Sequence, residues 1–326
     1  MAIFNLRYDL RRPEFARASS AELAQAAIEQ CEFADRHGFL SATLSEHHGS
    51  PDGYLPSPLV LAAAVAARTR QVRLMIAALI APLHDPIRIA EDLAVVDVIS
   101  NGRLIPVLAA GYVASEFATF GRDLGERGRL LDEAVEVLKR AWTGEPFEYR
   151  GRTVRVTPRP VQQPRPPIFL GGSTRAAARR AARIADYLIP STPEVFEMYR
   201  AELNRLGKPD PGPLPASTGN FVHVAEDPDA AWRHIAPHAL HETNAYGRWL
   251  ADAGLAGPYR QHRDADSLRA SGQYLVLTPD ELVARARALG PTATITLHPL
   301  MGGLHPDHGW ESLRLVVEKV MPALAQ

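Results

Sequence analysis

The chain has 326 residues, of which 46% are hydrophobic and 22% are charged, as is usual for a globular protein with a large core. Its 36 basic and 37 acidic side chains give a formal net charge of -1, so no basic excess is available to bind a nucleic-acid backbone. The single cysteine, Cys31, excludes an intrachain disulfide and disfavours a cysteine-based metal site. The N-terminus lacks a signal-peptide core, and the apolar runs are shorter than a membrane span. We therefore expect a cytoplasmic protein without nucleic-acid or membrane partners.

Segments typical of strands and of helices alternate along most of the chain. Eight strand-helix pairs at this length favour a closed (β/α)8 barrel, the TIM barrel, over an open sheet. The first helix is predicted to begin with a capping box formed by Ser19 and Glu22. Ser57 and Asp85, each followed by proline, predict the starts of the next two helices. The strands are expected at residues 3–8, 39–45, 72–81, 103–109, 168–170, 187–190, 216–225 and 292–297, and later helices at 126–142, from 173, from 192 and at 310–323.

Two segments depart from this simple alternation within a single domain, residues 1–326. Residues 147–149 and 154–156 flank a turn at 150–151, which predicts a small β-hairpin appended to the barrel. Residues 238–278 lie between the seventh and eighth strands and are rich in glycine, histidine and arginine. Loops this long are usually functional, so we predict a lid-like insertion; a surface excursion with its own short helices is the alternative.

The second and third helices are apolar around most of their circumference, with the sequences PSPLVLAAAVAART and DPIRIAEDLAVVDVIS. A helix on the outside of a barrel normally keeps one polar face toward water. We therefore predict that another subunit covers these helices. Burial under loops of the same chain is the alternative.

Candidate functional residues gather at the expected carboxyl ends of the strands, where barrel active sites lie. Glu46, His47 and His48 end the second strand. Neighbouring side chains on a strand point in opposite directions, so one histidine should enter the barrel mouth, where it could transfer protons near neutral pH. A structural role for both histidines is the alternative. Ala77 and Ala78, on the third strand, would allow a flat ligand to lie against the backbone, or they simply fill the core.

A glycine-rich turn after the fifth strand predicts an anion site. Gly171, Gly172, Ser173 and Thr174 precede a helix, so that free amides and hydroxyls lie at its positive N-terminal end. Arg175 adds positive charge nearby. A tight turn with an N-cap is the alternative. The turn matches neither the Walker nor the GxGxxG pattern, which disfavours nucleoside triphosphates and NAD as ligands.

Taken in order, these segments resemble the bacterial luciferase-like monooxygenase family, the LLM class of flavin-dependent oxidoreductases. The resemblance covers residues 4–324. The motifs that carry it are SEHH, VRLMIAALIAPLHDPIRIAEDLAVVDVISNGRL, GY-x3-EF-x2-FG, PIFLGGST and GGL-x5-WESLRLVVEKVMPAL. The most distinctive part is HDP-x3-AED-x4-D-x2-S-x-GR.

The resemblance implies a TIM-barrel enzyme that oxidises a small organic substrate with reduced FMN and O2. It also implies a separate flavin reductase and a homodimer packed through the second and third helices. His47 matches the family's catalytic histidine, which assists proton transfer, and residues 77–78 match a non-proline cis peptide beneath the flavin ring. The expected flavin-binding residues are Ala77, Ala78, Gly111, Tyr112, Gly171, Gly172, Ser173, Thr174 and Arg175, with the phosphate at residues 172–174. Tyr246, Trp249 and Tyr274 are candidate walls of the substrate pocket.

One departure from the family pattern opens alternatives. Family members frequently carry an arginine that pairs with the phosphate at the position of Ala110, and its loss should weaken flavin binding unless Arg175 replaces it. An F420-dependent oxidoreductase that transfers hydride is one alternative, and a non-catalytic barrel subunit is another. A metal hydrolase using His298, His305 and His308 is disfavoured because no partnered set of ligands accompanies them, and we predict no metal site.

Overall fold

The computed structural model describes residues 2–219 and 221–325. Within them, the main sheet has the strand order β10-β9-β11-β1-β2-β3-β4-β7-β8, and every pairing in it is parallel. Its strands are β1 (Ile3–Tyr8), β2 (Ser41–Leu44), β3 (Arg73–Ile80), β4 (Leu104–Ala109), β7 (Phe169–Gly172), β8 (Tyr187–Pro190), β9 (Val222–Val224), β10 (Leu275–Leu277) and β11 (Thr294–Leu297). The helices are α1 (Ser20–Arg36), α2 (Pro58–Arg68), α3 (Pro86–Ser100), α4 (Ala114–Thr119), α5 (Arg127–Ala141), α6 (Arg175–Ile184), α7 (Pro193–Arg205), α8 (Pro228–Asp252), α9 (Ala265–Ala270), α10 (Pro279–Leu289), α11 (Pro306–Leu315) and α12 (Met321–Ala325).

The strand order is that of a (β/α)8 barrel, which confirms the predicted fold class. Strands β1, β2, β3, β4, β7 and β8 follow one another, and β11 and β9 continue the sheet on the other side of β1. β10 is an additional parallel strand beyond β9 that the sequence did not predict. Among the described residues no ladder joins β8 to β10, so the ring of strand hydrogen bonds is open there. The expected seventh strand includes residue 220, which lies outside the described residues; what is observed of it is β9 and one bridge from Ser217 to Thr294.

The first strand shows how the sequence separates the two faces of the barrel wall. Phe4, Leu6 and Tyr8 are buried on the outer face, beneath the helices. Asn5 and Arg7 alternate with them and face the barrel interior. The alternation is the two-residue period of a β-strand. It leaves polar side chains inside the barrel, where they line a cavity.

The predicted helix starts are confirmed, with one correction. Ser19 and Glu22 form the complete capping box of α1, and the Asp85 side chain accepts N–H groups at the start of α3. Ser57 precedes α2 as predicted, but its side chain makes no capping hydrogen bond. Its ψ of 70° departs from the extended backbone that places a cap hydroxyl over the first turn.

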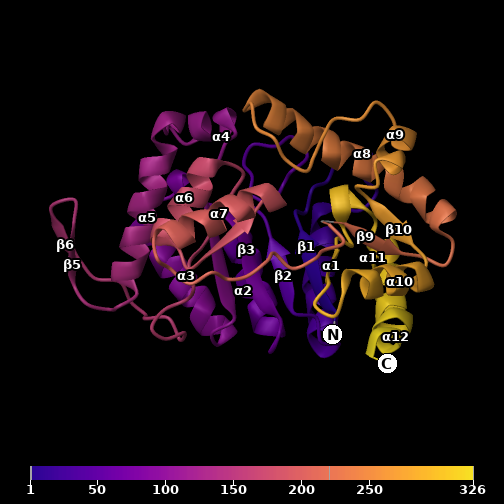
Figure 1. Ribbon diagram of the computed structural model, residues 1–326, viewed down its shortest axis with the longest axis horizontal. Coiled ribbons are helices and arrows are strands. Elements are labelled where there is room, and N and C mark those ends of the chain that lie inside the picture. The colour runs from indigo at the N-terminus through magenta and orange to yellow at the C-terminus, as the bar shows by residue number, and fades with distance from the viewer. Residues whose placement is uncertain (1, 220, 326) are drawn as a thin grey trace.

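The appended hairpin is confirmed as β5 (Phe147–Tyr149) paired antiparallel with β6 (Arg152–Val154). Its second strand begins two residues earlier than expected. Arg150 and Gly151 both have positive φ, as in a tight two-residue hairpin turn, so the chain reverses at once. In Figure 1 the hairpin projects from one side of the molecule, away from the barrel strands.

The segment between the seventh and eighth barrel strands is more regular than expected. The expected start at residue 238 falls inside α8, a helix of 25 residues that continues through Pro237. After α8 come an irregular stretch, α9 and the added strand β10. Figure 1 shows α4 and α8 at the end of the barrel opposite the two chain termini.

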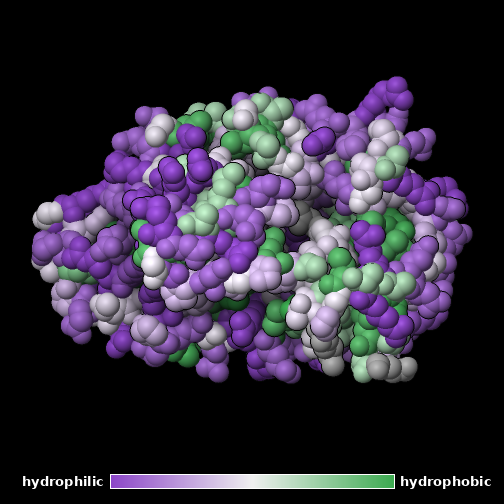
Figure 2. Space-filling model, viewed as in Figure 1, coloured by the Kyte–Doolittle hydropathy of each residue, from purple (hydrophilic) through white to green (hydrophobic). Residues whose placement is uncertain are grey.

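The exterior is mostly polar over α5, α6 and α7, on the face shown in Figure 2. Four large apolar side chains are exposed on α2 and α3: Val60, Val95, Val98 and Ile99. No described helix is both long enough and apolar enough to cross a membrane.

Candidate active site

A cavity of about 1050 Å³ occupies the barrel interior and its mouth. It extends from Ile3 and Arg73, at the beginnings of their strands, to residues at the carboxyl ends. Nine of the predicted site residues line it: His47, Ala77, Ala78, Gly111, Tyr112, Gly171, Gly172, Ser173 and Thr174. Segments more than 100 residues apart in the sequence therefore meet at one cavity.

His47 is held by a carboxylate that the sequence reasoning did not single out. Its Nδ1 lies 2.8 Å from Oε1 of Glu116, on α4, and the same oxygen accepts the backbone N–H of His48 at 2.9 Å. A carboxylate at Nδ1 fixes the tautomer that carries its hydrogen there and leaves Nε2 as the free ring nitrogen. Glu116 belongs to the GY-x3-EF motif, which was the one available signal.

Aromatic rings surround His47 at the mouth of the cavity. The Trp249 ring, from α8, lies 4.4 Å from the imidazole at 33°, and Tyr54 meets it edge-on at 4.8 Å. Of the predicted pocket walls, Tyr246 lines the cavity and Trp249 covers His47. Tyr274 was wrongly placed, because it is buried in a separate cluster and its hydroxyl is engaged by Glu242.

Small residues of three strands line another part of the cavity. The peptide bond between Ala77 and Ala78 is cis, as the resemblance implied. A Cβ at Gly171 would lie 3.6 Å from Cγ1 of Val107, 3.7 Å from the Cβ of Ala78 and 3.8 Å from that of Ala109, so small groups of β3, β4 and β7 meet here beside Val107. Ala109 and Ala110 continue this surface. A flat ring system can pack closely against such small groups.

The glycine-rich turn leads tightly from β7 into α6. A Cβ at Gly172 would lie 2.3 Å from the Cβ of Ala177, so only glycine fits at this position. Thr174, rather than Ser173, is the N-cap, and its hydroxyl accepts the N–H of Ala177 at 3.2 Å. Ser173 and Thr174 nevertheless both line the cavity. The turn therefore presents two hydroxyls at the positive end of a helix.

The structure corrects the predicted source of positive charge at this turn. Arg175 is exposed and does not line the cavity. Arg127 and Arg180 line it instead. The Arg180 guanidinium is held by Asp132 at 2.6 Å, and a Cβ at Gly128 would lie 2.7 Å from its Nη2. Helix α5 thus reaches the cavity through a close contact with Arg180 of α6.

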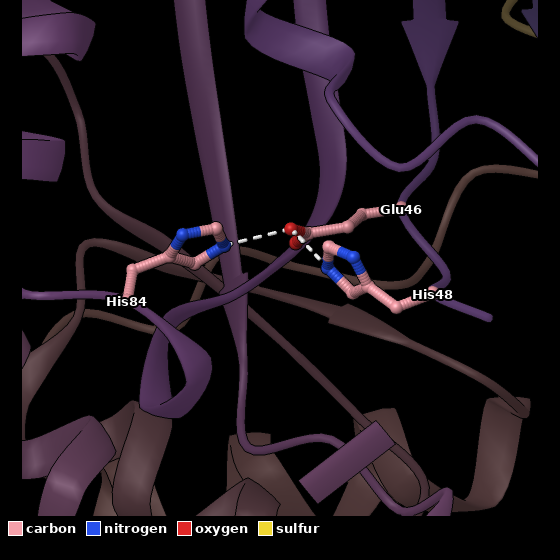
Figure 3. A group of neighbouring side chains, drawn as sticks. All are labelled: Glu46, His48 and His84. Carbon is pink, nitrogen blue, oxygen red and sulfur yellow. Dashed lines mark hydrogen bonds and ion pairs between the residues drawn. The ribbon is translucent and has the colours of Figure 1, made fainter. Parts of the chain in front are cut away.

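The second histidine of the pair, His48, does not line the cavity with His47 and belongs to the cluster shown in Figure 3. Glu46 Oε1 accepts hydrogen bonds from Nε2 of His48 at 2.9 Å and from Nε2 of His84 at 2.7 Å, and Oε2 accepts the N–H of Ile80. Burial alone would raise the pKa of Glu46, but these hydrogen bonds lower it to about 2. The three side chains present possible metal ligands within 4.8 Å of one another, yet their spacing is that of ordinary hydrogen bonds. The cluster ties the end of β2 to the end of β3.

The three C-terminal histidines considered as metal ligands do not converge. His298 is buried, with Asp9 at 3.6 Å and Glu242 at 3.5 Å, whereas His305 caps α11 and His308 stacks on His234. The metal-hydrolase alternative therefore has no shared site at these histidines.

Comparison with known proteins places the chain in a family. The family model described as luciferase-like monooxygenase matches residues 11–297. An F420-dependent glucose-6-phosphate dehydrogenase of Nocardia farcinica is 30% identical over 279 residues, which are 82% of this chain and 76% of that protein. The oxygenase component of a flavin-dependent trigonelline monooxygenase of Acinetobacter baylyi is 34% identical over 156 residues, which are 46% of this chain and 43% of that protein. The chain spans about half the length of several curated relatives that it matches.

The fold has a close counterpart among solved structures. A monooxygenase from Streptomyces bottropensis superposes with a TM-score of 0.77 at 27% identity, covering 98% of this chain and 99% of the other. The match includes the barrel and the segment after β9, since it spans nearly the whole of both chains. The chain belongs to the luciferase-like monooxygenase family.

Proposed function

We propose that this protein is an oxygenase that uses reduced FMN and O2 to oxidise a small organic substrate. The observation that carries the proposal is the His47–Glu116 pair, with His47 lining a large cavity that Ala77, Ala78 and Gly171 also line. Family membership supports the same reaction class, and the relative from Acinetobacter baylyi is named as an oxygenase component.

The cavity suits a flavin in size and in chemistry. Its volume of about 1050 Å³ is at the upper end of the range for ligand sites, which leaves room for a cofactor and a small substrate together. The buried hydroxyl of Ser191 lines it and has no hydrogen-bond partner among the described residues, as expected of a group that binds a polar ligand. We assign the flavin ring to Ala77, Ala78, Gly111 and Tyr112, and the phosphate to the turn at residues 171–174.

When bound, reduced FMN would supply the electrons that activate O2. The protein's own residues then have three tasks. His47 holds or moves a proton at Nε2, since Nδ1 is engaged by Glu116. Trp249 and Tyr54 cover the imidazole and exclude water from it. The segment after β9 acts as the lid, because it contributes Trp249 and Tyr246.

The missing arginine at position 110 need not abolish flavin binding. Ala110, Arg127 and Arg180 line the same cavity as Ser173 and Thr174. We infer that Arg180, with Arg127, replaces the family's phosphate-binding arginine. We do not assign this role to Arg175, because its side chain is exposed and does not line the cavity.

We also infer a homodimer and a separate flavin reductase. The exposed apolar side chains of α2 and α3, among them Val60 and Val98, support a dimer packed through these helices. The reductase is inferred from the name of the oxygenase component among the relatives. A cytoplasmic location remains the expectation from the sequence.

An F420-dependent oxidoreductase is the second candidate, because a relative of that name aligns with 82% of this chain. A non-catalytic barrel subunit, the alternative raised by Ala110, is disfavoured by the His47–Glu116 pair.

Titration of the purified protein with FMN, with reduced FMN and with F420, followed by visible absorbance, separates these candidates. We expect binding of FMN and of reduced FMN, and faster oxidation of reduced FMN by O2 in wild type than in His47→Ala. Tight binding of F420 with no response to FMN would favour the second candidate. Failure to bind any of the three would refute the proposal.

A further inference from the structure

The cavity has a second charged end, formed by Arg7 of β1. Arg7 lines the cavity, and its side chain is only 12% exposed. Its Nη1 donates to the Tyr259 hydroxyl at 2.5 Å and its Nη2 to the Tyr246 hydroxyl at 2.9 Å. The two phenol rings stack on each other at 4.4 Å. The guanidinium is therefore fixed in place by α8 and by the segment that follows it.

The charges lining the cavity are mostly positive. Arg7, Arg73, Arg127 and Arg180 line it, whereas the carboxylate on its described lining, Glu46, already accepts three hydrogen bonds. A cavity with charge of one sign and low-dielectric walls concentrates ligands of the opposite sign. The lining itself therefore carries more guanidinium groups than carboxylates, although Asp132 pairs with Arg180 and Glu242 with Arg7.

Arg7 has a buried carboxylate as its neighbour. The nearest carboxylate oxygen, Oε1 of the buried Glu242, lies 3.6 Å from Nη1 and forms an ion pair with Arg7 at a distance beyond a hydrogen bond; it also faces His298 at 3.5 Å. The neighbouring carboxylates of Asp9 and Asp52 pair with Arg11, at 3.3 Å and 2.6 Å. Arg7 is therefore not an isolated charge, and a ligand would bind it through the N–H groups that the two phenols leave free.

The hydroxyls next to Arg7 are arranged to donate. Tyr259 and Tyr246 use oxygen lone pairs to accept from Arg7, so their own hydrogens remain for other partners. The Tyr246 hydroxyl also shares a 2.7 Å hydrogen bond with that of Tyr54, which leaves one hydrogen of this pair free. Burial raises the pKa of all three phenols, so they stay protonated at neutral pH. This end of the cavity offers hydrogen-bond donors, which a ligand rich in acceptors would satisfy.

Near Arg7 and His47 the surroundings are aromatic and apolar. The rings of Tyr54 and Tyr246 lie 4.8 Å and 5.9 Å from His47, and Leu250 and Pro258 also line this region. A planar molecular body fits between such rings better than a bulky one.

We propose that the substrate is a small planar organic acid whose carboxylate binds Arg7 and the hydroxyls of Tyr259 and Tyr54, with its ring beside His47. Arg7 is then a residue that determines specificity. The inference rests on the proposed function for the identity of the cavity, but the binding of an acid can be measured without flavin.

The test is calorimetric titration with planar acids (benzoate, 4-hydroxybenzoate and cinnamate), with their methyl esters, with benzylamine and with benzenesulfonate. Wild type is compared with Arg7→Gln and with Tyr259→Phe. The second variant removes only one hydroxyl, so it keeps the test usable if Arg7→Gln does not fold. Arg73→Gln is the matched control, because it removes the same charge from the far end of the same cavity. Each titration is run without flavin and repeated with FMN.

We expect at least one acid to bind wild type and Arg73→Gln at least tenfold more tightly than its ester or benzylamine, the scale of one hydrogen bond to a charged group. Arg7→Gln should abolish that preference, and Tyr259→Phe should reduce it. The proposal is overturned if no acid binds, if esters bind as well as acids, or if benzenesulfonate binds tenfold better than every acid. It is also overturned if Arg180→Gln, rather than Arg7→Gln, removes the preference. A protein that binds the acids but no flavin would refute the proposed function and leave this inference standing.

Discussion

Replacing Glu116 tests how the protein positions its candidate catalytic histidine. Glu116 Oε1 accepts from His47 Nδ1 at 2.8 Å and from the His48 N–H at 2.9 Å. Glu116→Gln keeps a carbonyl oxygen that can accept both hydrogen bonds and removes only the charge. Hydrogen bonds to charged groups contribute about 1–1.5 kcal/mol more than neutral ones, so the rate should fall about tenfold.

Glu116→Ala removes the acceptor as well. It leaves two buried N–H donors without a partner, each at a cost of about 1–3 kcal/mol, so both stability and rate should fall. The rate is followed as reoxidation of reduced FMN by O2 under saturating flavin, and stability by urea unfolding. Asp35→Asn is the control, because Asp35 also accepts buried backbone N–H groups, but at the opposite end of the barrel. Wild-type rates in Glu116→Gln and Glu116→Ala would refute a role for Glu116 in positioning His47.

The remaining predictions concern the cofactor, the fold, pH and assembly. Arg180→Gln should weaken FMN binding about tenfold while leaving riboflavin binding unchanged, as fluorescence titration would show; equal losses for both would argue against a phosphate contact. Gly172→Ala should lower the free energy of unfolding by about 1–3 kcal/mol, because its Cβ would overlap a neighbour on α6, and an unchanged urea midpoint would contradict the close approach. Burial raises the pKa of Asp35, but three backbone N–H hydrogen bonds lower it overall, so this carboxylate stabilises the fold above its unfolded pKa of about 4. The stability difference between wild type and Asp35→Asn should therefore be full at pH 7 and shrink as the pH falls below about 4, and a difference independent of pH would be inconsistent with this linkage. Val60→Asp, at a position 73% exposed on α2, should convert a dimer to a monomer in light scattering, whereas a monomeric wild type would remove the basis for this interface.

Local patterns in the sequence were sufficient to predict many strands and helix starts of the barrel. The strand at Ile3–Tyr8 and the capping box at Ser19 were predicted correctly, because each depends on residues close together in the chain. β10 was not predicted, because three residues, Leu275–Leu277, carry too little pattern and become a strand only by pairing with β9. α8 was obscured by Pro237, which normally interrupts a helix but lies within this one.

The candidate site shows the same difference between residues that local motifs identify and residues that only the fold brings together. His47 and the turn at 171–174 were identified from compact motifs, and both line the cavity. Glu116 lies 69 positions from His47, and only the fold brings the two together. Arg180 reaches the cavity through contacts with α5, whereas Arg175, adjacent to the motif in sequence, faces outward. Proximity in sequence pointed to Arg175, whereas the fold brings Arg180 to the cavity lining.

A crystal structure of the protein soaked with FMN would be the most direct examination of how this cavity is used. We predict electron density for the tricyclic ring beside Ala77 and Ala78, phosphate oxygens within hydrogen-bond distance of Ser173 or Thr174, and His47 Nε2 facing the ring. Density for FMN outside the barrel, or an empty cavity at saturating FMN, would contradict the account.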